Sequence, residues 1–301
     1  MTECHIDALP EFLDRVSPWL LREPVLHNVF LTVLEAKRLG RVPEASGDRW
    51  IRAVDEYGEV VGAAMYTPPR ELLLGEVSEP VAHALARYAA AHLDPLTGAV
   101  ATTAVAEWLA TGYAEAAGVA AKRRMSSRIF RLDTEPAPPF TVPGRAREAT
   151  AADRDLLIAW ADAFAAEASP NDAPPVDNSR PIDARLKLGG LLWIWEDGGE
   201  PVAMAWITPP VADMTRINAV YTPPERRGRG YASGCVAAAS THAQTALAST
   251  CMLYTDLTNP TSNKIYQAIG YRAVQDGRLW RFRYPSTASP EEGRPRLRLV
   301  R

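Results

Sequence analysis

The chain has 301 residues, 47% of them hydrophobic, with a formal net charge of −3 and a pI near 6.0. This balance gives no overall basic field for nucleic acid or a membrane surface, and no run of 18 apolar residues occurs. The three cysteines and five scattered histidines lack metal-ligand spacing, so the sequence predicts reduced thiols, no metal site and a cytoplasmic protein.

The first part of the chain predicts two helices followed by two strands. Residues 9–22 and 25–39 carry apolar side chains at helical spacing. Residues 50–54 and 60–66 are typical of strands, and residues 55–58 form a hairpin turn between them.

An internal repeat indicates a duplicated α/β unit. Residues 58–69 align without a gap with residues 199–210, and both segments end in Thr-Pro-Pro. Residues 128–132 show the same polar and apolar alternation as residues 278–282. The length is ample for two such units of about 140 residues each.

Residues 134–144 hold four prolines and a glycine, which predicts a stiff, extended segment outside either sheet. We therefore expect a first unit, a proline-rich linker, a second unit and a flexible tail, at residues 1–135, 136–144, 145–284 and 285–301.

The second unit begins with a predicted helix at residues 155–168 and an exposed loop at residues 169–181. Residues 216–221 then alternate as a strand, which Thr222-Pro223-Pro224 ends because proline cannot donate a ladder hydrogen bond. A long alanine-rich helix is predicted at residues 231–247.

A glycine-rich basic turn joins this strand to the helix. Gly228 and Gly230 permit positive φ, and the free N–H groups of the helix start suit a diphosphate. The turn is neither a Walker loop nor a dinucleotide fingerprint, because no Lys-Ser/Thr follows and Ser233 replaces the third glycine. A basic turn that contacts only water is the alternative.

The segment Arg227-Gly-Arg-Gly-Tyr-Ala232 matches (Q/R)-x-x-G-x-(G/A) and resembles the GNAT superfamily of acyl-CoA N-acyltransferases. The chain also resembles predicted bacterial acetyltransferases with a C-terminal FR47-like domain. The resemblance implies an α/β (α+β) fold of two tandem GNAT-like domains, each a mixed, largely antiparallel sheet flanked by helices. It implies acetyl-CoA, or another acyl-CoA, as co-substrate, bound by Val220, Tyr221, Thr222, Arg227, Gly228, Arg229, Gly230, Tyr231 and Ala232.

A second motif follows at residues 259–270. Asn259 is suited to cap a helix with Pro260 at its first position, and Tyr266 then has a place in the core. The spacing of Asn259, Ser262 and Tyr266 also resembles the second GNAT motif. The resemblance implies that Asn259 and Ser262 lie beside the cofactor and that Tyr266 protonates the leaving sulfur. It also implies that a backbone N–H near Val220 polarises the thioester carbonyl.

The general base is not assigned. Met214 stands where histone-type GNAT enzymes carry a glutamate, and Asp213 replaces it only if the strand begins later or is bulged. A water relay and an acceptor amine that arrives neutral are the alternatives.

The first unit lacks the glycine-rich loop. Glu76, Glu79 and Pro80 occupy the expected helix start, where glutamates repel a diphosphate. We therefore expect that this unit has lost cofactor binding and serves as a structural or substrate-shaping partner; retained but unconventional cofactor binding is the alternative.

Together these features predict an acyl-CoA-dependent N-acyltransferase that acetylates a primary amine of a small molecule. A transferase with a carrier-protein or aminoacyl-tRNA donor and a non-catalytic acyl-CoA sensor are the alternatives. The charge favours no nucleic-acid or membrane partner, and the chain is expected to be a monomer or homodimer.

Overall fold

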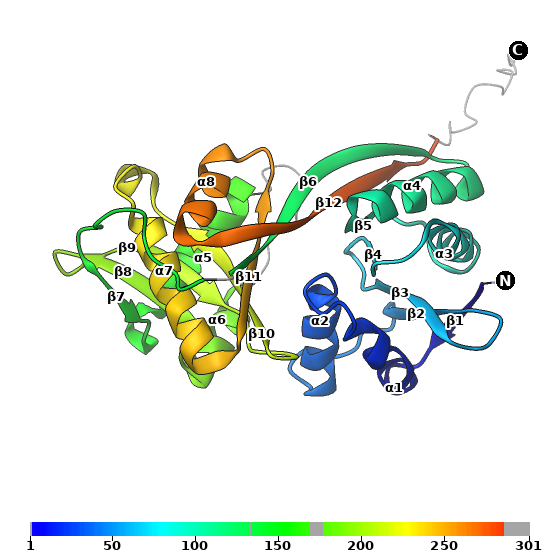
Figure 1. Cartoon of the computed structure of the whole chain (residues 1–301), viewed down its shortest axis with the longest axis horizontal. Helices are drawn as coiled ribbons and strands as arrows, with labels where there is room; N and C mark the ends of the chain where they lie inside the picture. The colour runs from blue at the N-terminus through cyan, green and yellow to red at the C-terminus, as the bar shows by residue number, and fades with distance from the viewer. Residues whose placement is uncertain (1, 133, 169–176, 286–301) are drawn as a thin grey trace, which may run out of the picture.

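The computed structural model describes residues 2–132, 134–168 and 177–285. The chain repeats one order of elements, and its two halves lie side by side in Figure 1. The first half (residues 2–132) contains β1 (Glu3–Asp7), α1 (Leu9–Leu20), α2 (Asn28–Arg38), β2 (Arg49–Val54), β3 (Val60–Tyr66), β4 (Leu72–Leu74), α3 (Glu79–His92), β5 (Gly98–Thr102), α4 (Thr103–Ala117) and β6 (Ala120–Leu132). The second half (residues 134–285) contains β7 (Arg145–Glu148), α5 (Arg154–Ala168), α6 (Ser179–Leu188), β8 (Leu192–Asp197), β9 (Glu200–Ile207), β10 (Met214–Tyr221), α7 (Tyr231–His242), β11 (Thr250–Asp256), α8 (Pro260–Ile269) and β12 (Tyr271–Arg283). The predicted duplication and the α/β class are confirmed.

One sheet of 12 strands runs through both halves in the order β1-β2-β3-β4-β5-β12-β6-β11-β10-β9-β8-β7. The halves exchange their last strands, because β12 pairs with β5 and β6 pairs with β11. Strands β6 and β12 also pair with each other, from Ala120 opposite Arg283 to Leu132 opposite Tyr271. The predicted linker at residues 136–144 therefore separates the two repeats in the sequence, but the sheet continues from one half to the other.

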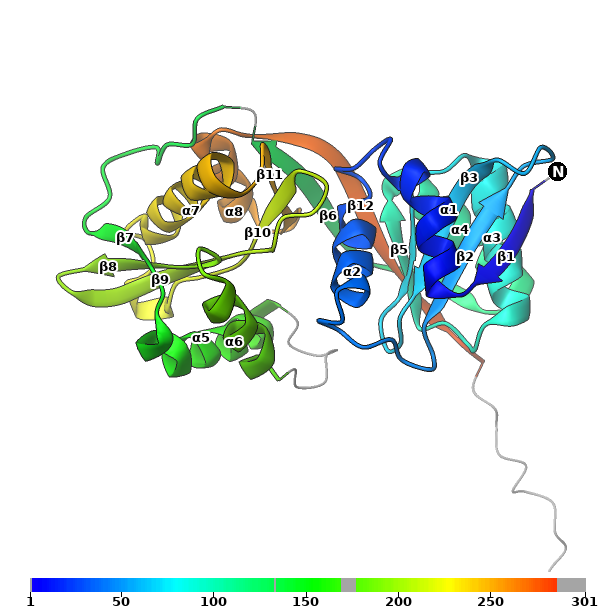
Figure 2. The same cartoon turned by 90° about the horizontal axis from the view of Figure 1, so that it is seen from below.

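Helices cover both faces of the sheet. In the second half, α7 and α8 lie on one side of the strands and α5 and α6 on the other (Figure 2). Buried Ile217 and Leu253 face α7, whereas Trp206 and Met204 pack with α5 and α6. In the first half, α1 to α4 share one apolar core with the strands. Within the described ranges, each helix is too short or too polar to cross a bilayer.

The described part of the linker, residues 134–144, forms no strand and packs against the second half. The carbonyl oxygen of Pro143 accepts a 2.7 Å hydrogen bond from Trp195 Nε1, and Val142 is buried in the core beneath α7. The ring of Phe140 lies against Gly230. The linker is therefore held beside the glycine-rich turn.

Several boundaries differ from the predictions. Strands β1 and β4 are not predicted, since each is short and lacks a clear alternation. The predicted loop at residues 169–181 is shorter, because residues 179–181 form the first turn of α6. Residues 169–176 of that loop and residues 286–301 of the expected tail lie outside the described residues.

Candidate active site

Strand β10 separates from its neighbours in its second half. It pairs in parallel with β11 only from Met214 to Ile217. Its register with β9 shifts between Asn218 and Tyr221, so Ala219 and Val220 have no partner residue in β9. Ala219 adopts a φ of +45°, a left-handed conformation that costs a non-glycine residue about 1–2 kcal/mol. The strands therefore diverge beside Val220.

The glycine-rich turn has the conformation that its sequence requires. Gly228 and Gly230 have φ of +78° and +82°, and Gly230 precedes the first residue of α7. A Cβ atom on Gly228 would meet no other atom within 4 Å, so there is open space beside this residue. Helix α7 continues into a π-helical turn at Ala243–Leu247, in agreement with the predicted long helix. The positive end of a substantial helix thus faces the turn.

The side chains of the turn divide into two groups. Arg227 is held by the structure, since its Nε donates to the carbonyl oxygen of Thr222 at 2.8 Å and its Nη2 to Glu167 at 2.7 Å. Tyr231 is buried, and its hydroxyl donates to Asp197. Arg229 is exposed and has no ion-pair partner among the described residues. Two of the predicted cofactor ligands, Arg227 and Tyr231, therefore use their side chains in hydrogen bonds within the protein.

Helix α8 begins as predicted. The Oδ1 atom of Asn259 accepts a 3.0 Å hydrogen bond from the backbone N–H of Ser262, and Pro260 is the first helical residue. Gly270 ends the helix with a φ of +121°. The capping role of Asn259 is confirmed, and the hydrogen bonds of the described residues do not use its amide nitrogen.

Tyr266 lies among aromatic side chains on the α7 side of the sheet. Its ring centroid is 6.4 Å from that of Phe130 and 6.1 Å from that of Tyr271. Val220 packs against the same apolar cluster, so the fold brings both predicted residues to one region. Burial raises the pKa of Tyr266 to about 12. The phenol therefore keeps its proton at neutral pH, and its hydroxyl has no hydrogen-bond partner within the described ranges.

Asp213 does not lie at this site, which corrects its prediction as the base. It precedes β10 in a tight turn with φ of +56°, seven residues from Val220 or about 20 Å along an extended strand. Its carboxylate accepts hydrogen bonds from the backbone N–H and hydroxyl of Ser249, which lower its pKa. Asp213 therefore fastens the β10 and β11 ends together.

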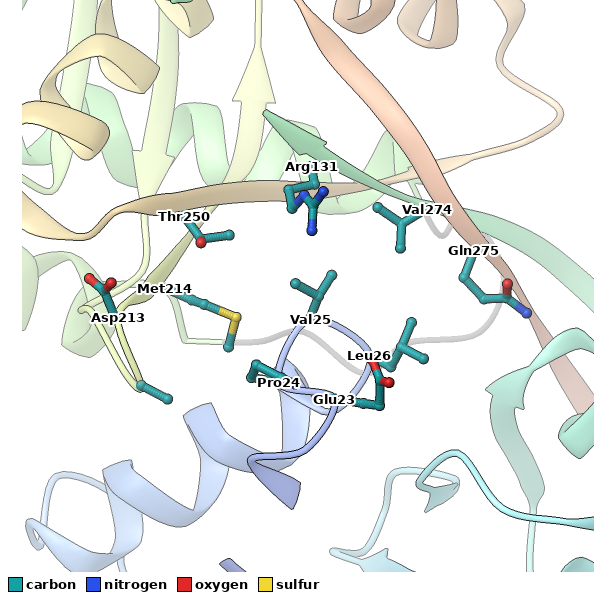
Figure 3. A pocket seen from close by; sticks show the side chains of 11 residues that line it. Glu23, Pro24, Val25, Leu26, Arg131, Asp213, Met214, Thr250, Val274 and Gln275 are labelled. Atoms are coloured by element: carbon teal, nitrogen blue, oxygen red, sulfur yellow. The ribbon is translucent and has the colours of Figure 1, made fainter. Parts of the chain in front are cut away.

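A cavity of about 340 Å³ lies between the halves (Figure 3). We call it the inter-half cavity. Its wall combines residues 23–26 of the first half with Met214 and Thr250 of the second and with Arg131 on the exchanged strand β6. Met214 also lines a much smaller space, of about 10 Å³, beside Asn28 and Arg216.

Asn28 and Arg216 line this smaller space, and neither they nor Arg185 of α6 stand out in the sequence as site residues. Arg216 Nη1 donates to Asn28 Oδ1 of α2 at 2.7 Å, which joins the halves. Arg185 of α6 lies over Trp206, with its guanidinium carbon 5.2 Å from the ring centroid. One feature of the sequence could have pointed to Arg216: it is the only charged residue in β10, whose other residues are mostly apolar or small.

The turn equivalent to the glycine-rich loop in the first half is filled by side chains. The backbone N–H of Glu76 donates to His27 Nε2 at 2.9 Å, and the Glu76 carboxylate accepts from Thr102 Oγ1 at 2.6 Å. A Cβ atom on Gly75 would lie 2.6 Å from the ring of Trp19. No open glycine turn is therefore present at this position.

Comparison with known proteins agrees with this geometry. Residues 157–271 match the model of the acetyltransferase (GNAT) family, and a search of curated proteins found no match. A GNAT acetyltransferase from Colwellia psychrerythraea has a similar structure, at 12% identity and a TM-score of 0.60, over 93% of this chain and 98% of that one. A GCN5-related N-acetyltransferase from Sphaerobacter thermophilus is similar at 14% identity and a TM-score of 0.61, over 93% and 95%. A tandem GNAT protein from the clavulanic acid biosynthesis pathway is similar at 12% identity and a TM-score of 0.56, over 93% and 98%.

Residues 157–271 thus resemble the acetyltransferase (GNAT) family, and the glycine-rich turn lies inside this matching region. The matching domain, residues 157–271, includes β10, the turn, α7 and most of α8 with Tyr266. The likeness to the GNAT proteins extends over both halves, and the likeness to the tandem GNAT protein shows that the chain as a whole has that fold.

Proposed function

We propose that this chain transfers an acetyl group from acetyl-CoA to a primary amine of a small molecule, at a single site in its second half. The observation that carries the proposal is the divergence of β10 from β11 after Ile217, directly before the glycine-rich turn at the start of α7. The GNAT fold supports transfer from an acyl-CoA in general, and the acetyl group and the amine are our finer proposal.

The residues around the turn fit the diphosphate of coenzyme A. There is open space beside Gly228, and Thr222 Oγ1 is buried without a hydrogen-bond partner among the described residues. Backbone N–H groups from Gly228 to Ala232, with the charge of Arg229, supply donors to phosphate oxygens. Asn259 and Ser262 at the start of α8 are proposed to line the pantetheine arm.

Acetyl-CoA supplies the acetyl group as a thioester, which an amine can attack at the carbonyl carbon. The N–H of Val220 is proposed to donate to the carbonyl oxygen where negative charge develops. Tyr266 holds its proton at neutral pH because burial raises its pKa to about 12. So weak an acid acts mainly by donating a hydrogen bond to the departing sulfur. As the C–S bond breaks, the thiolate takes a proton, and the nitrogen of the new amide gives up one proton to the phenol or to water, so the phenol ends protonated.

The acceptor is proposed to enter between the halves by way of the inter-half cavity, which Asp213 and Met214 line at the start of β10, and to extend from there along the strand toward Val220. That cavity is within the usual size of a small-molecule site. Since no base is assigned, the amine is expected to react in its neutral form. The rate at limiting amine should then rise about tenfold for each pH unit below the pKa of the amine, near 10.4 for an alkylamine.

Release of free thiol from acetyl-CoA by the full-length protein tests this function. A panel of primary amines is compared with buffer alone, and mass spectrometry identifies the acetylated product. We expect amine-dependent release with at least one class of small amine. Tight binding of acetyl-CoA without amine-dependent release would instead support a sensor. Competition by an acyl carrier protein would support the carrier-protein donor.

A further inference from the structure

Two arginines of the second half lie on the face of the sheet opposite α7. Arg185 of α6 stacks over Trp206, and Arg216 of β10 has its guanidinium carbon 5.7 Å from the ring centroid of Tyr254. Trp206 and Asn218 are partners across β9 and β10, and side chains two residues apart on a strand share a face. Arg216 and Asn218 therefore line the same surface, beside the divergence of β10.

Both guanidinium groups contact only neutral acceptors. Arg185 donates to the carbonyl oxygens of Pro181 at 3.0 Å and Ile207 at 3.4 Å, and Arg216 donates to the Asn28 amide. In residues 2–132, 134–168 and 177–285, neither forms an ion pair with a carboxylate. Burial lowers the pKa of Arg185 to about 10, helped by the charge of Arg216. Burial likewise lowers the pKa of Arg216. An enclosed cation without a counter-charge is costly, so this surface favours an anionic ligand.

Two further polar atoms on this surface have no hydrogen-bond partner in the described part of the chain. Trp206 Nε1 and Asn218 Oδ1 are buried and unpaired. The indole N–H can only donate, and the amide oxygen can only accept. A ligand that satisfies both carries an acceptor for Trp206 and an N–H group for Asn218. Because Asn218 borders the divergence at Ala219, the N–H group of such a ligand lies next to the proposed site of transfer.

The space available suits a small anionic group. Beside Arg216 and Asn28 there is about 10 Å³, room for one water-sized group such as a carboxylate oxygen. Met214 lines both this space and the inter-half cavity, so the two spaces are neighbours. We propose that the acceptor is an amine that also bears a carboxylate, and that Arg185 and Arg216 bind this carboxylate while Asn218 accepts a hydrogen bond from the amine. This inference rests on the proposed function, since it names the acceptor class for that site.

Calorimetry on the full-length protein with coenzyme A present tests the inference without requiring turnover. The probes are β-alanine and 4-aminobutanoate, each paired with the corresponding ω-amino amide, which has the same length but no carboxylate. We expect each acid to bind about tenfold or more tightly than its amide, as for a charged hydrogen bond. Equal affinity for acid and amide, or no binding of either acid, overturns the inference.

Variants assign the effect to the two arginines. Arg185→Gln and Arg216→Lys should each weaken acid binding about tenfold or more and leave amide binding unchanged. Arg38→Gln, which removes an exposed ion pair with Glu35, is the matched control and should change neither. If Arg216→Lys does not fold, Arg185→Gln alone tests the assignment. Acid binding by Arg185→Gln at the wild-type affinity would show that the arginines do not bind the carboxylate. Thiol release is scored separately, so acid binding without transfer would contradict the proposed function and leave the carboxylate site standing.

Discussion

The hydroxyl group of Tyr266 offers a clean test at the scale of one residue. It has no hydrogen-bond partner within the described ranges, and its ring alone packs with Phe130 and Tyr271. Tyr266→Phe should therefore leave the melting temperature nearly unchanged, because no hydrogen bond among the described residues is lost. If the phenol assists departure of the thiolate, the same change lowers kcat about 10- to 1000-fold with little effect on KM for acetyl-CoA. Stopped thiol-release assays measure both constants.

Tyr57→Phe is the control for this variant, since Tyr57 is 83% exposed at the tip of a hairpin in the first half. It should match the wild type in rate and stability. A wild-type kcat in Tyr266→Phe would show that Tyr266 serves only the core.

His27 makes stability depend on pH. Its Nδ1 lies 2.9 Å from the carbonyl oxygen of Leu20, and its Nε2 accepts from the N–H of Glu76, so the neutral ring satisfies both groups. Burial lowers the pKa of His27 below the usual 6.5. The unfolded chain takes up a proton first as the pH falls, so this stability is complete above pH 6.5 and is lost from there toward the lowered pKa. Each unit of lowering corresponds to about 1.4 kcal/mol.

Urea unfolding at about pH 7.5 and 5.5 checks this expectation against the usual pKa of histidine. His27→Gln should lose less stability between the two conditions than the wild type. His92→Gln, at an exposed position, should keep the wild-type difference. Equal losses in the wild type and His27→Gln would contradict the role of His27.

Residue roles were predictable from sequence where the signal is local. The cap at Asn259 and the positive φ of Gly228 and Gly230 follow from residue type and spacing within one turn. The commitment of Arg227 to Glu167 was not predictable, because it joins residues 60 positions apart. Asp213 was misplaced for a related reason, since the start of β10 depends on its contacts with Ser249.

Among elements, the strand, turn and helix around the glycine-rich loop were predicted with nearly the observed bounds. Prolines end β10, glycines form the turn, and a long alanine-rich run forms α7. The resemblance implied a splayed strand near Val220, and the register of β10 shifts there. Residue type alone did not mark the position, because Ala219 is an alanine where a glycine would indicate positive φ.

The start of α7 predicts a specific electrostatic effect. Arg229→Glu replaces an exposed cation beside the helix N-terminus with an anion and should raise the Kd for coenzyme A about tenfold or more. The difference should shrink at high salt, because exposed charges are screened. Calorimetry at low and high ionic strength measures it, with the exposed Arg41→Glu in the first half as control. Unchanged affinity at low salt would remove Arg229 from the binding site.

At the scale of the whole molecule, the exchange of β6 and β12 could not be predicted from the sequence. Both strands have 13 residues, and their central segments show the same alternation of polar and apolar residues. Either strand therefore presents an equivalent edge to β5 or β11, and register patterns alone do not choose between them. Which strand pairs with β5 and which with β11 depends on long-range contacts. One such contact is the packing of residues 134–144 on the second half, where Trp195 donates to the carbonyl oxygen of Pro143.

The exchange predicts that the halves stay together after the connection between them is cut. A protease site inserted after Pro138 separates the chain into two pieces, each of which contributes a 13-residue strand to the sheet of the other. Dissociation would expose Phe130, Leu132 and Phe282 and leave the ladders of β5 and β11 unpaired, which costs both apolar burial and backbone hydrogen bonds. The cleaved protein should therefore elute from a size-exclusion column at the position of the uncut chain, retain coenzyme A binding, and separate only in denaturant. Elution of two separate folded pieces in native buffer would show that each half completes its own sheet in solution.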